Sequence, residues 1–333
     1  MFTMSRSSLQ KYCEQFANRK IGVLGDFALD CYWTIDASAA LPSIETGKPT
    51  KPVSAQHYAP GAAGNVATNL MALGCAQVRA FGVIGKDPWG TELKQTLQDR
   101  AVDTSGIMQQ EQNWATTAYV KPLINGVEQN RFDFGDFNEL HEQTAIRLIS
   151  ALEASLPDLD AIIINAQARA SIHTPMLRRA LQTLIQQHPQ KIFVVDSREP
   201  QTMYAGAMLK INNHELAKVS DANITTDTVC DALKRLYAQR KQTVFVTCGP
   251  EGIVVCDANG CTRIDGISVD GPLDTTGGGD AAIAGITAAL SVKAQSAEAA
   301  FMGNLAAAVC VRKLQQTGTA SPREMLALHA DSR

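Results

Sequence analysis

The sequence predicts an α/β protein with a mostly parallel β-sheet that is covered by helices on both faces. Short apolar runs of strand length alternate with helical patterns over most of the 333 residues. This rhythm is typical of right-handed βαβ units, whose strands are buried on both faces. A chain of this length can bury a large core, so one α/β domain with an appendage fits as well as two equal domains.

Turn and cap residues mark where the first elements begin and end. A strand is expected over 21–24, and a helix over 66–73 ends at Gly74, a residue that favours helix C-termini. A strand over 78–84 leads into the segment GKDP (85–88), a favourable start for a helix. The same patterns predict helices over 140–156, 176–185 and 231–240, and strands over 161–164, 192–195 and 243–247.

Polar residues follow four of the predicted strands. They are Gly25-Asp26, Asn165, Asp196 and Thr247. In a parallel sheet the carboxyl ends of the strands lie at one edge, and ligands bind there. We therefore expect the functional site at this edge.

Two stretches, 31–58 and 114–134, have alternating β-rich patterns and no helix between their strands. Inside the second stretch, Asn125-Gly126 is a strong signal for a two-residue hairpin turn. We predict a small antiparallel lobe that is inserted in two pieces into the α/β domain. Ordinary hairpins at the edge of the main sheet are the alternative.

Composition excludes several classes of partner. The net charge of -3 and the pI near 6.1 argue against nucleic acid or an anionic membrane surface as the main partner. The polar N-terminus lacks the hydrophobic region of a secretory signal, and the apolar stretch 281–292 is too short to span a membrane. The 8 cysteines are scattered without a C-x-x-C pair, so we expect a cytoplasmic location and no zinc site.

The segment DTTGGGD (274–280) carries the most chemical information. Gly277, Gly278 and Gly279 open a helical pattern, although glycine is costly inside regular elements. Free N–H groups at a helix N-terminus bind anions, and Asp280 is placed to accept a proton from a hydroxyl that attacks a phosphoryl group. The helix N-terminus is expected to keep that carboxylate ionised. A flexible turn with a capping aspartate is the alternative.

Two familiar nucleotide-binding motifs do not fit the sequence. No G-x-x-x-x-G-K-[ST] segment occurs, which excludes a P-loop enzyme. Gly277, Gly279 and Ala282 satisfy G-x-G-x-x-A, but the chain about 20 residues later is helical and holds no strand with an acidic end. A dinucleotide-binding site is therefore disfavoured.

Two N-terminal segments supply candidates for binding a polyol. Asp26 and Asp30 follow the first strand, where carboxylates accept hydrogen bonds from hydroxyl groups. Gly61, Gly64 and Asn65 lie in a run of small residues that lets a ligand approach the backbone. A turn aspartate and tight helix packing are the alternatives.

Together these segments resemble the signatures of the PfkB/ribokinase family of carbohydrate kinases. Residues 274–280 are similar to the family's D-x-T-G-A-G-D signature, with Gly278 in place of alanine, and 60–67 are similar to its P-G-G-A-A-N-V-A signature. Five motifs match in the family's order over nearly the whole chain. The other three are 25–30 (the sugar-binding first strand), 212–215 (N-x-x-E) and 246–252 (the nucleotide-side loop).

The resemblance implies a single ribokinase-like kinase domain over 1–333, with a β-lid formed by 31–58 and 114–134. It implies ATP as phosphoryl donor, Mg²⁺, Asp280 as general base, and Gly277, Gly278 and Gly279 as an anion hole for the transferred phosphoryl group.

The resemblance also implies roles around the nucleotide. Asn212 and Glu215 would organise Mg²⁺ through water. Asp274 and Thr276 are candidates for holding a monovalent cation such as K⁺, as in several family members. The implied nucleotide-binding residues are Asn212, Glu215, Thr247, Gly249, Gly252 and Asn304.

Within the family, 25–33, 131–134 and 318–322 look like the kinase part of the bifunctional heptose 7-phosphate kinase/adenylyltransferases. Where those enzymes have S-D-Y-A-K-G and D-P-K, this chain has NAQARA (165–170) and DSR (196–198). These departures lie on the acceptor side, so they bear on the sugar and not on ATP.

For the acceptor we expect hydroxyl contacts from Asp30, from the 61–65 segment and from Asp26. We hypothesise that at least one of Arg131, Arg169 and Arg198 binds a phosphate already on the sugar, because arginine grips phosphate with two hydrogen bonds. Ordinary surface arginines are the alternative.

Small members of the family pair through an apolar face of the lid, so the resemblance implies a homodimer. Two other functions stay open: a non-catalytic sugar- or nucleotide-binding protein on the kinase scaffold, and a nucleoside kinase.

Overall fold

The computed structural model describes residues 2–199, 203–220, 224–225, 228–314 and 318–331. Its main sheet is mostly parallel, as predicted, and only the last two strands run antiparallel to their neighbours. In spatial order the nine strands are β14 (Gly260–Asp265), β13 (Gly252–Asp257), β12 (Val244–Thr247), β11 (Met208–Asn212), β10 (Ile192–Ser197), β9 (Ala161–Ala166), β1 (Lys20–Gly25), β4 (Gln77–Gly85) and β5 (Asp103–Gln110).

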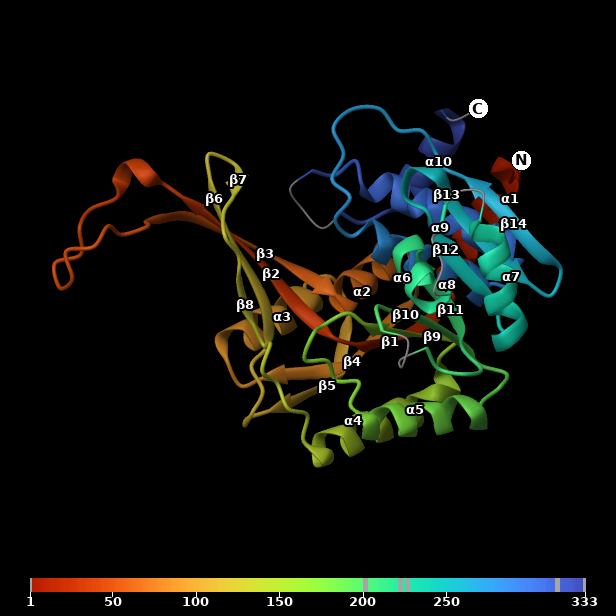
Figure 1. The fold of residues 1–333 in the computed structure, drawn as a ribbon, viewed down its shortest axis with the longest axis horizontal. Coiled ribbons are helices and arrows are strands. Elements are labelled where there is room, and N and C mark those ends of the chain that lie inside the picture. The colour runs from red at the N-terminus through yellow and green to blue at the C-terminus, as the bar shows by residue number, and fades with distance from the viewer. Residues whose placement is uncertain (1, 200–202, 221–223, 226–227, 315–317, 332–333) are drawn as a thin grey trace.

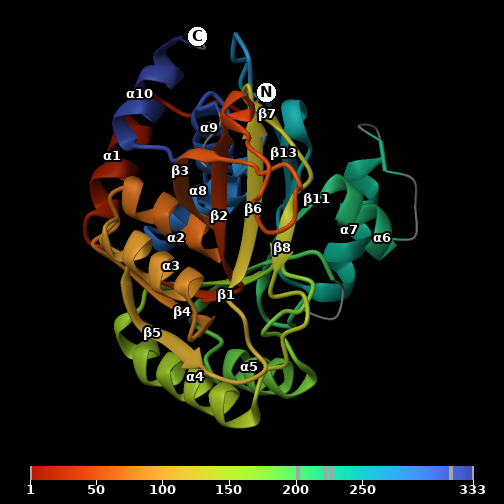
Figure 2. The same cartoon turned by 90° about the vertical axis from the view of Figure 1, so that its left-hand side faces the viewer.

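Helices cover both faces of this sheet (Figures 1 and 2), and each face has its own hydrophobic core. One face carries α1 (Arg6–Phe16), α2 (Ala63–Ala72), α8 (Gly278–Ser291), α9 (Ser296–Cys310) and α10 (Pro322–Asp331). The other carries α4 (Glu142–Ser155), α5 (Pro175–Gln187), α6 (Asn213–Ser220) and α7 (Val229–Arg240). Within the described ranges, no helix has both the length and the apolar character needed to cross a bilayer.

The helix α8 is the central helix of its layer. Every residue from Ala281 to Ser291 is buried, because the helix lies between the sheet and its neighbours α2 and α9. A helix that is apolar all round can be stable only in such a buried position. Its N-terminus, with the glycine run, therefore has a fixed place at the carboxyl edge of the sheet.

The predicted helix start after 85–88 is confirmed. Helix α3 (Pro88–Gln98) begins at Asp87, whose carboxylate accepts a hydrogen bond of 2.7 Å from the N–H of Gly90. The same carboxylate accepts a hydrogen bond of 2.8 Å from the N–H of Thr116. One aspartate thus caps the helix and fixes the chain where it enters the second sheet.

The second sheet contains β2 (Phe27–Ile35), β3 (Val53–Ala62), β6 (Thr117–Ile124), β7 (Val127–Glu128) and β8 (Phe132–Phe134). We call it the lid sheet. Asn125 and Gly126 join β6 to β7 with φ angles of 51° and 76°, the left-handed pair that the predicted hairpin turn requires.

The prediction of a wholly antiparallel lobe is wrong, because β2 and β6 pair in parallel. The reason lies in the connections: β2 follows β1, β6 follows β5, and β1 and β5 run in the same direction in the main sheet. Both lid strands therefore leave the same edge of that sheet in the same direction. Parallel strands cannot be joined by a tight hairpin, which explains why the lobe comes in two separate pieces.

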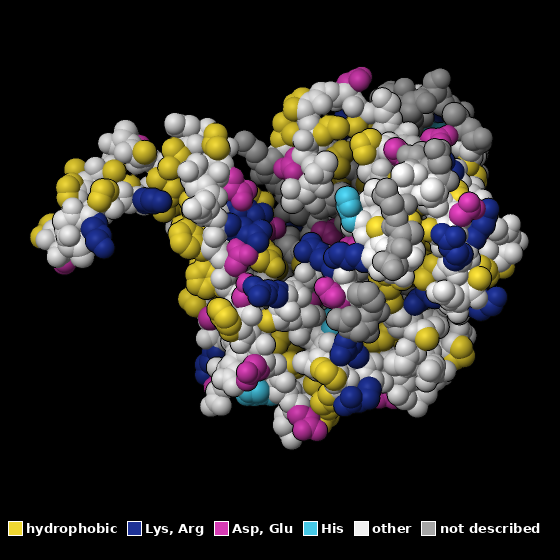
Figure 3. Space-filling model, in the orientation of Figure 1, with side chains coloured by type: hydrophobic (Ala, Val, Ile, Leu, Met, Phe, Trp, Pro, Cys, Tyr) yellow, Lys and Arg dark blue, Asp and Glu magenta, His cyan; other side chains and the backbone are white. Residues whose placement is uncertain are grey.

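Aromatic side chains join the lid sheet to α3. The Trp89 ring lies 6.4 Å from Trp33, 6.3 Å from Tyr58 and 5.9 Å from Phe134, measured between ring centroids. This cluster covers one face of the lid sheet. The other face is polar and looks across a hollow toward the carboxyl edge of the main sheet (Figure 3).

Candidate active site

The N-terminus of α8 presents free backbone N–H groups. Gly277 precedes the helix with φ 79° and ψ -3°, a left-handed conformation that glycine adopts readily. The N–H of Gly278 is bonded to the carbonyl of Thr275 at 3.2 Å, but no acceptor among the described residues meets the N–H groups of Gly279 and Asp280. Two free donors and the positive end of a helix make this a fitting place for an anion.

Asp280 follows these glycines in the first turn of α8. Its Oδ2 accepts a hydrogen bond of 2.8 Å from Nδ2 of Asn65 in α2. Burial raises the pKa of the carboxyl to about 7, and the Asn65 hydrogen bond with the charges of Lys210 and Arg198 only partly offsets this rise. The expectation that the helix N-terminus keeps this carboxylate ionised is therefore wrong, because loss of solvation outweighs the helix dipole.

A polar row crosses the sheet under this helix end. Gly25, Asn165, Asp196 and Lys210 are register partners on four adjacent strands, β1, β9, β10 and β11. A Cβ on Gly25 would lie 2.3 Å from the carbonyl oxygen of Asn165, so this position requires glycine. The row brings together the strand ends that the sequence placed at one edge.

Lys210 is the residue that the sequence analysis missed. Its Nζ donates a hydrogen bond of 2.9 Å to Oδ2 of Asp196, and the two side chains are only 6% and 2% exposed. A Cβ on Gly279 would lie 3.2 Å from the same Nζ, so the ammonium group lies directly beside the glycine run. Burial alone would lower the pKa of Lys210, but the carboxylates of Asp196, Glu215 and Asp280 raise it, and the lysine keeps its charge.

Asn212 and Glu215 close the N-terminus of α6 by two reciprocal hydrogen bonds. The N–H of Asn212 donates to Oε2 of Glu215 at 2.8 Å, and the N–H of Glu215 donates to Oδ1 of Asn212 at 2.9 Å. Burial raises the pKa of the Glu215 carboxyl. One acceptor oxygen of each side chain is therefore already engaged in a hydrogen bond. This arrangement favours contact with a metal ion through a water molecule over direct coordination.

No group of three or more His, Cys, Asp or Glu side chains within the described ranges is arranged to hold a metal ion. Oxygen ligands are nevertheless present in Asn212 and Glu215, and Mg²⁺ characteristically keeps several waters and binds through substrate phosphates. The donor set therefore fits a magnesium ion that arrives with a nucleotide.

Of the other predicted nucleotide residues, Thr247 lies beside the N-terminus of α6, whereas Gly249 and Gly252 flank the turn between β12 and β13. Thr247 is the register partner of Asn212 on the neighbouring strand. Gly249 and Gly252 have φ angles of 59° and 95°, and a Cβ on Gly252 would lie 2.1 Å from the carbonyl oxygen of Ile264. Asn304 in α9 donates a hydrogen bond of 2.7 Å to the carbonyl of Asp265 at the end of β14.

The predicted cation residues form a local turn. Asp274 accepts a hydrogen bond of 2.9 Å from the N–H of Thr276, and its own N–H is bonded to the carbonyl of Val311 at 2.8 Å. The turn leads into Gly277 and fixes the approach to α8.

Asp26 was predicted to bind a hydroxyl of the acceptor, but in the structure its carboxylate holds a loop. Its carboxylate accepts hydrogen bonds from the N–H groups of Gln167, Ala168 and Ile172 and from the Ser171 hydroxyl, all at 2.8–2.9 Å. Both oxygens are therefore used to fix the 167–172 loop. The expectation that Asp26 binds an acceptor hydroxyl is corrected accordingly.

Asp30 faces the hollow from β2 and has a cationic partner. Lys121 in β6 lies 2.8 Å from Oδ1 of Asp30 and 3.2 Å from the Tyr32 hydroxyl, and both members of the ion pair are about nine-tenths buried. A Cβ on Gly61 would lie 3.0 Å from Oδ2 of Asp30, so Gly61 leaves this oxygen accessible to a small group. Gly64 instead serves packing, since a Cβ there would lie 2.9 Å from Pro60.

Lys and Arg side chains gather on both sides of the hollow in Figure 3. The three arginines predicted to bind an acceptor phosphate differ in their partners. Arg131 donates two hydrogen bonds of 2.6 Å to Asp133, and Arg169 is 85% exposed and 4.0 Å from Asp136. No carboxylate among the described residues pairs with Arg198.

The position of Arg198 follows from the groups that its charge affects. Burial raises the pKa of the Tyr119 hydroxyl in the lid, and the charge of Arg198 opposes this rise together with that of Arg131. The same charge opposes the rise in the pKa of Asp280. Arg198 is therefore close enough to both the lid and the end of α8 for its charge to act on each.

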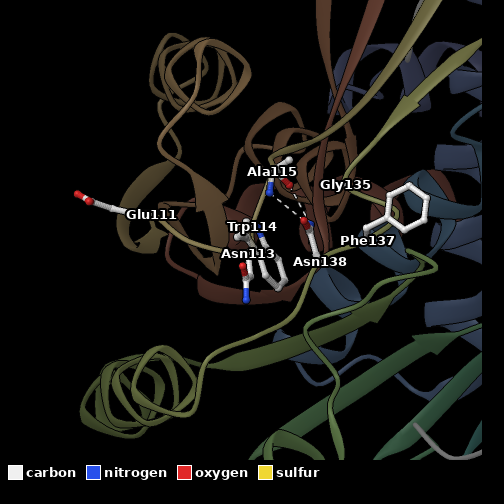
Figure 4. Close-up of a pocket in the computed structure, with 7 residues that line it drawn as sticks. All are labelled: Glu111, Asn113, Trp114, Ala115, Gly135, Phe137 and Asn138. Carbon is white, nitrogen blue, oxygen red and sulfur yellow. Dashed lines mark hydrogen bonds between the residues drawn. The ribbon is translucent and has the colours of Figure 1, made fainter.

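A separate hollow of about 310 Å³ lies where the chain enters and leaves the lid (Figure 4). Asn138 bridges it with two hydrogen bonds of 2.8 Å to the N–H and carbonyl of Ala115. None of the predicted site residues lines it. Its hydrogen bonds hold the beginning and the end of the second lid segment together at the base of the lid.

Comparison with known proteins agrees with this arrangement. A model of the pfkB family carbohydrate kinases matches residues 26–324. The chain belongs to this family. It is therefore a carbohydrate kinase, and the family predicted from the motifs is confirmed.

Two relatives are bifunctional HldE proteins. The chain is 28% identical over 318 residues to the one from Coxiella burnetii, covering 94% of this chain and 64% of that protein. It is 29% identical over 328 residues to the one from Shewanella piezotolerans, covering 95% and 65%. The chain thus spans slightly less than two thirds of the length of these relatives.

Solved structures confirm the ribokinase-like fold. Phosphofructokinase-2 from Escherichia coli in complex with potassium superposes with a TM-score of 0.72 at 19% identity, over 94% of this chain and 99% of that one. A ribokinase from Arabidopsis thaliana complexed with ribose and ATP gives 0.68 at 16% identity, over 94% and 99%.

Proposed function

We propose that the chain transfers the γ-phosphoryl group of ATP to a hydroxyl of a sugar that already carries a phosphate, in the manner of the heptose phosphate kinases. The observation that carries the proposal is the arrangement around α8. A carboxyl with a pKa near 7 lies beside free N–H groups and a buried lysine. The charge of Arg198, which has no carboxylate partner among the described residues, acts on both this carboxyl and Tyr119 of the lid.

Asp280 acts as the general base of this reaction. Its carboxylate takes the proton from the acceptor hydroxyl as the hydroxyl oxygen bonds to the γ-phosphorus, and the bond between that phosphorus and ADP breaks. The N–H groups of Gly279 and Asp280 and the ammonium of Lys210 bind the negative charge on the transferred group. The products are ADP and the sugar with one more phosphate.

Asn212 and Glu215 would hold Mg²⁺ through water at the strand edge next to Lys210. When bound, the ion neutralises phosphate charge and makes ADP a better leaving group. Thr247, Gly249 and Gly252 would lie along the nucleotide, with Asn304 at the adenine. Support comes from the open space at Gly249, where no atom lies within 4 Å of a Cβ.

Arg198 would bind the phosphate already present on the acceptor, while Asp30 and Asn65 contact its hydroxyl groups. Arg131 and Arg169 have carboxylate partners, which makes Arg198 the favoured ligand among the three. A binding protein without catalysis would not need a carboxyl that titrates near neutral pH. A nucleoside acceptor would not need Arg198.

Two further expectations remain proposals. A monovalent cation at Asp274 and Thr276 is supported by their shared turn before Gly277. A cytoplasmic location is supported by the cysteines, all of which are free thiols.

We also propose that the chain pairs with a second copy through the apolar face of the lid sheet. Phe132 and Phe134 lie on one face of β8, are 56% and 40% exposed, and continue the cluster around Trp89. Exposed aromatic groups that continue a packed cluster are typical of protein interfaces.

Turnover is expected with Mg·ATP and a phosphorylated pentose, hexose or heptose, measured as ADP release. Because Asp280 must be ionised to act, kcat/KM should fall about tenfold for each pH unit below the pKa near 7 and level off above it. Asp280→Asn should retain ATP binding and lose about 10²- to 10⁴-fold in rate. ATP binding without turnover on any acceptor would instead support the non-catalytic alternative.

Replacing Arg198 by alanine should raise KM for the phosphorylated acceptor by about 10- to 100-fold, because a hydrogen-bonded charge pair is lost. The KM for the same sugar without its phosphate should change little. Arg147→Ala, an exposed arginine of α4, is the matched control. Equal losses for both acceptors would contradict a phosphate-binding role.

Sedimentation of the full chain tests the lid interface. We expect a dimer that Phe132→Asp converts to a monomer, since a buried carboxylate at the contact is costly. Ile146→Asp in α4, where the side chain is 46% exposed, should leave the mass unchanged. A monomeric unmodified protein would rule the interface out.

A further inference from the structure

Asn69 is a buried polar residue without an assigned part in the reaction. It lies in α2 one helical turn after Asn65 and is 0% exposed. Its Nδ2 donates to Oδ1 of Asn65 at 3.0 Å, to the Asn65 carbonyl at 3.0 Å, and more weakly to the Gly318 carbonyl at 3.4 Å. Asn65 in turn donates to Asp280, so the two asparagines form a chain that ends at the proposed base.

One end of the buried Asn69 amide opposes folding. Its Oδ1 is buried without a partner among the described residues, and an unsatisfied buried acceptor opposes folding. The two carbonyls that it contacts have other donors: the Asn65 carbonyl accepts from the Thr68 hydroxyl, and the Gly318 carbonyl accepts from the Cys310 thiol, both at 3.0 Å. Only Oδ1 of Asn65 depends on Asn69.

The hydrogen bond from Asn69 to Oδ1 of Asn65 determines the orientation of the Asn65 amide. The two ends of an amide are nearly equal in size but opposite as hydrogen-bonding groups. If the amide were turned over, its oxygen would face Oδ2 of Asp280 and repel it. A donor at the far end is what makes the observed orientation the stable one.

We propose that Asn69 is a positioning residue that holds the Asn65 amide with its N–H toward Asp280 and so keeps the carboxylate directed and ready to take a proton. The inference rests on the proposed function of Asp280 as the base. It adds a residue in a neighbouring helix that touches neither substrate nor the reacting atoms.

The other charged and titratable groups around Asp280 come from different elements. Asp196 and Lys210 act from β10 and β11, Arg198 from the chain after β10, and the Cys310 thiol from α9. None of these charged groups has a hydrogen bond to Asn69 among those that the described residues form. A change at Asn69 should therefore reach Asp280 through Asn65.

Asn69→Leu tests the proposal, because leucine has nearly the shape of asparagine and no donor. The Asp280 carboxyl is followed by carbon NMR in protein labelled at the aspartate carboxyl carbon, with Asp280→Asn to assign its signal. We expect its pKa to rise by about one unit, the loss of a hydrogen bond to a charged group, and the acidic limb of kcat/KM to move by the same amount. The melting temperature should change little, because the variant removes the unpaired Oδ1 of Asn69 while Oδ1 of Asn65 loses its donor.

Thr68→Val is the matched control, since it removes a hydrogen bond to the Asn65 carbonyl and leaves the amide untouched. It should not move the Asp280 titration. In an Asn65→Ala background, Asn69→Leu should have no further effect, because the link is already broken.

An unchanged titration in Asn69→Leu, the same shift in Thr68→Val, or a full shift in the Asn65→Ala background would each overturn the proposal. A shift of the carboxyl in protein that turns over no acceptor would support the link and count against the proposed function alone. The NMR and kinetic readouts thus separate the two claims.

Discussion

One buried ammonium group compensates three carboxylates at the end of α8, and the rest of the site depends on this balance. Asp196, Glu215 and Asp280 all act on Lys210, and only Asp196 is bonded to it. Removing charges from water is costly unless each is paired, and with all three carboxylates ionised this centre would hold two more negative than positive charges. Burial first, and the charge of Asp196 in addition, raise the pKa of Asp280 to about 7, within the range that a general base needs at neutral pH. Glycine at position 279 suits this arrangement, because a Cβ there would lie only 3.2 Å from Nζ of Lys210.

The hydrophobic periodicity and the turn residues predicted the elements of the fold well, because both depend on interactions between residues that are close in the sequence. Asp87 caps α3, and Asn125-Gly126 adopts the left-handed hairpin turn, because backbone geometry and nearby donors decide both. The parallel pairing of β2 with β6 was not predictable in this way, since it depends on where two distant segments leave the main sheet. The spacing of residues in the sequence does not show whether two strands joined by a long connection pair in parallel or antiparallel.

The motifs named candidates for part of the site, and what they missed had more than one cause. The motifs located Asp280, Asn212 and Glu215, but burial decides ionisation, and burial is a property of the folded chain. Lys210 was overlooked because a lysine in the short strand MLKIN is read as a surface residue. A signal existed: a charged residue in a strand that is buried on both faces needs a partner, and Asp196 ends the neighbouring strand. Asp26 was misassigned for the opposite reason, since its four donors lie far along the chain and leave no local pattern.

A crystal structure with Mg²⁺ and a non-hydrolysable ATP analogue tests the central claim most directly. The account predicts that the γ-phosphate accepts hydrogen bonds from the N–H groups of Gly279 and Asp280 and from Nζ of Lys210, with the space between Asp280 and Arg198 left for the acceptor. A terminal phosphate bound elsewhere, with Lys210 still bonded to Asp196 alone, would contradict the account.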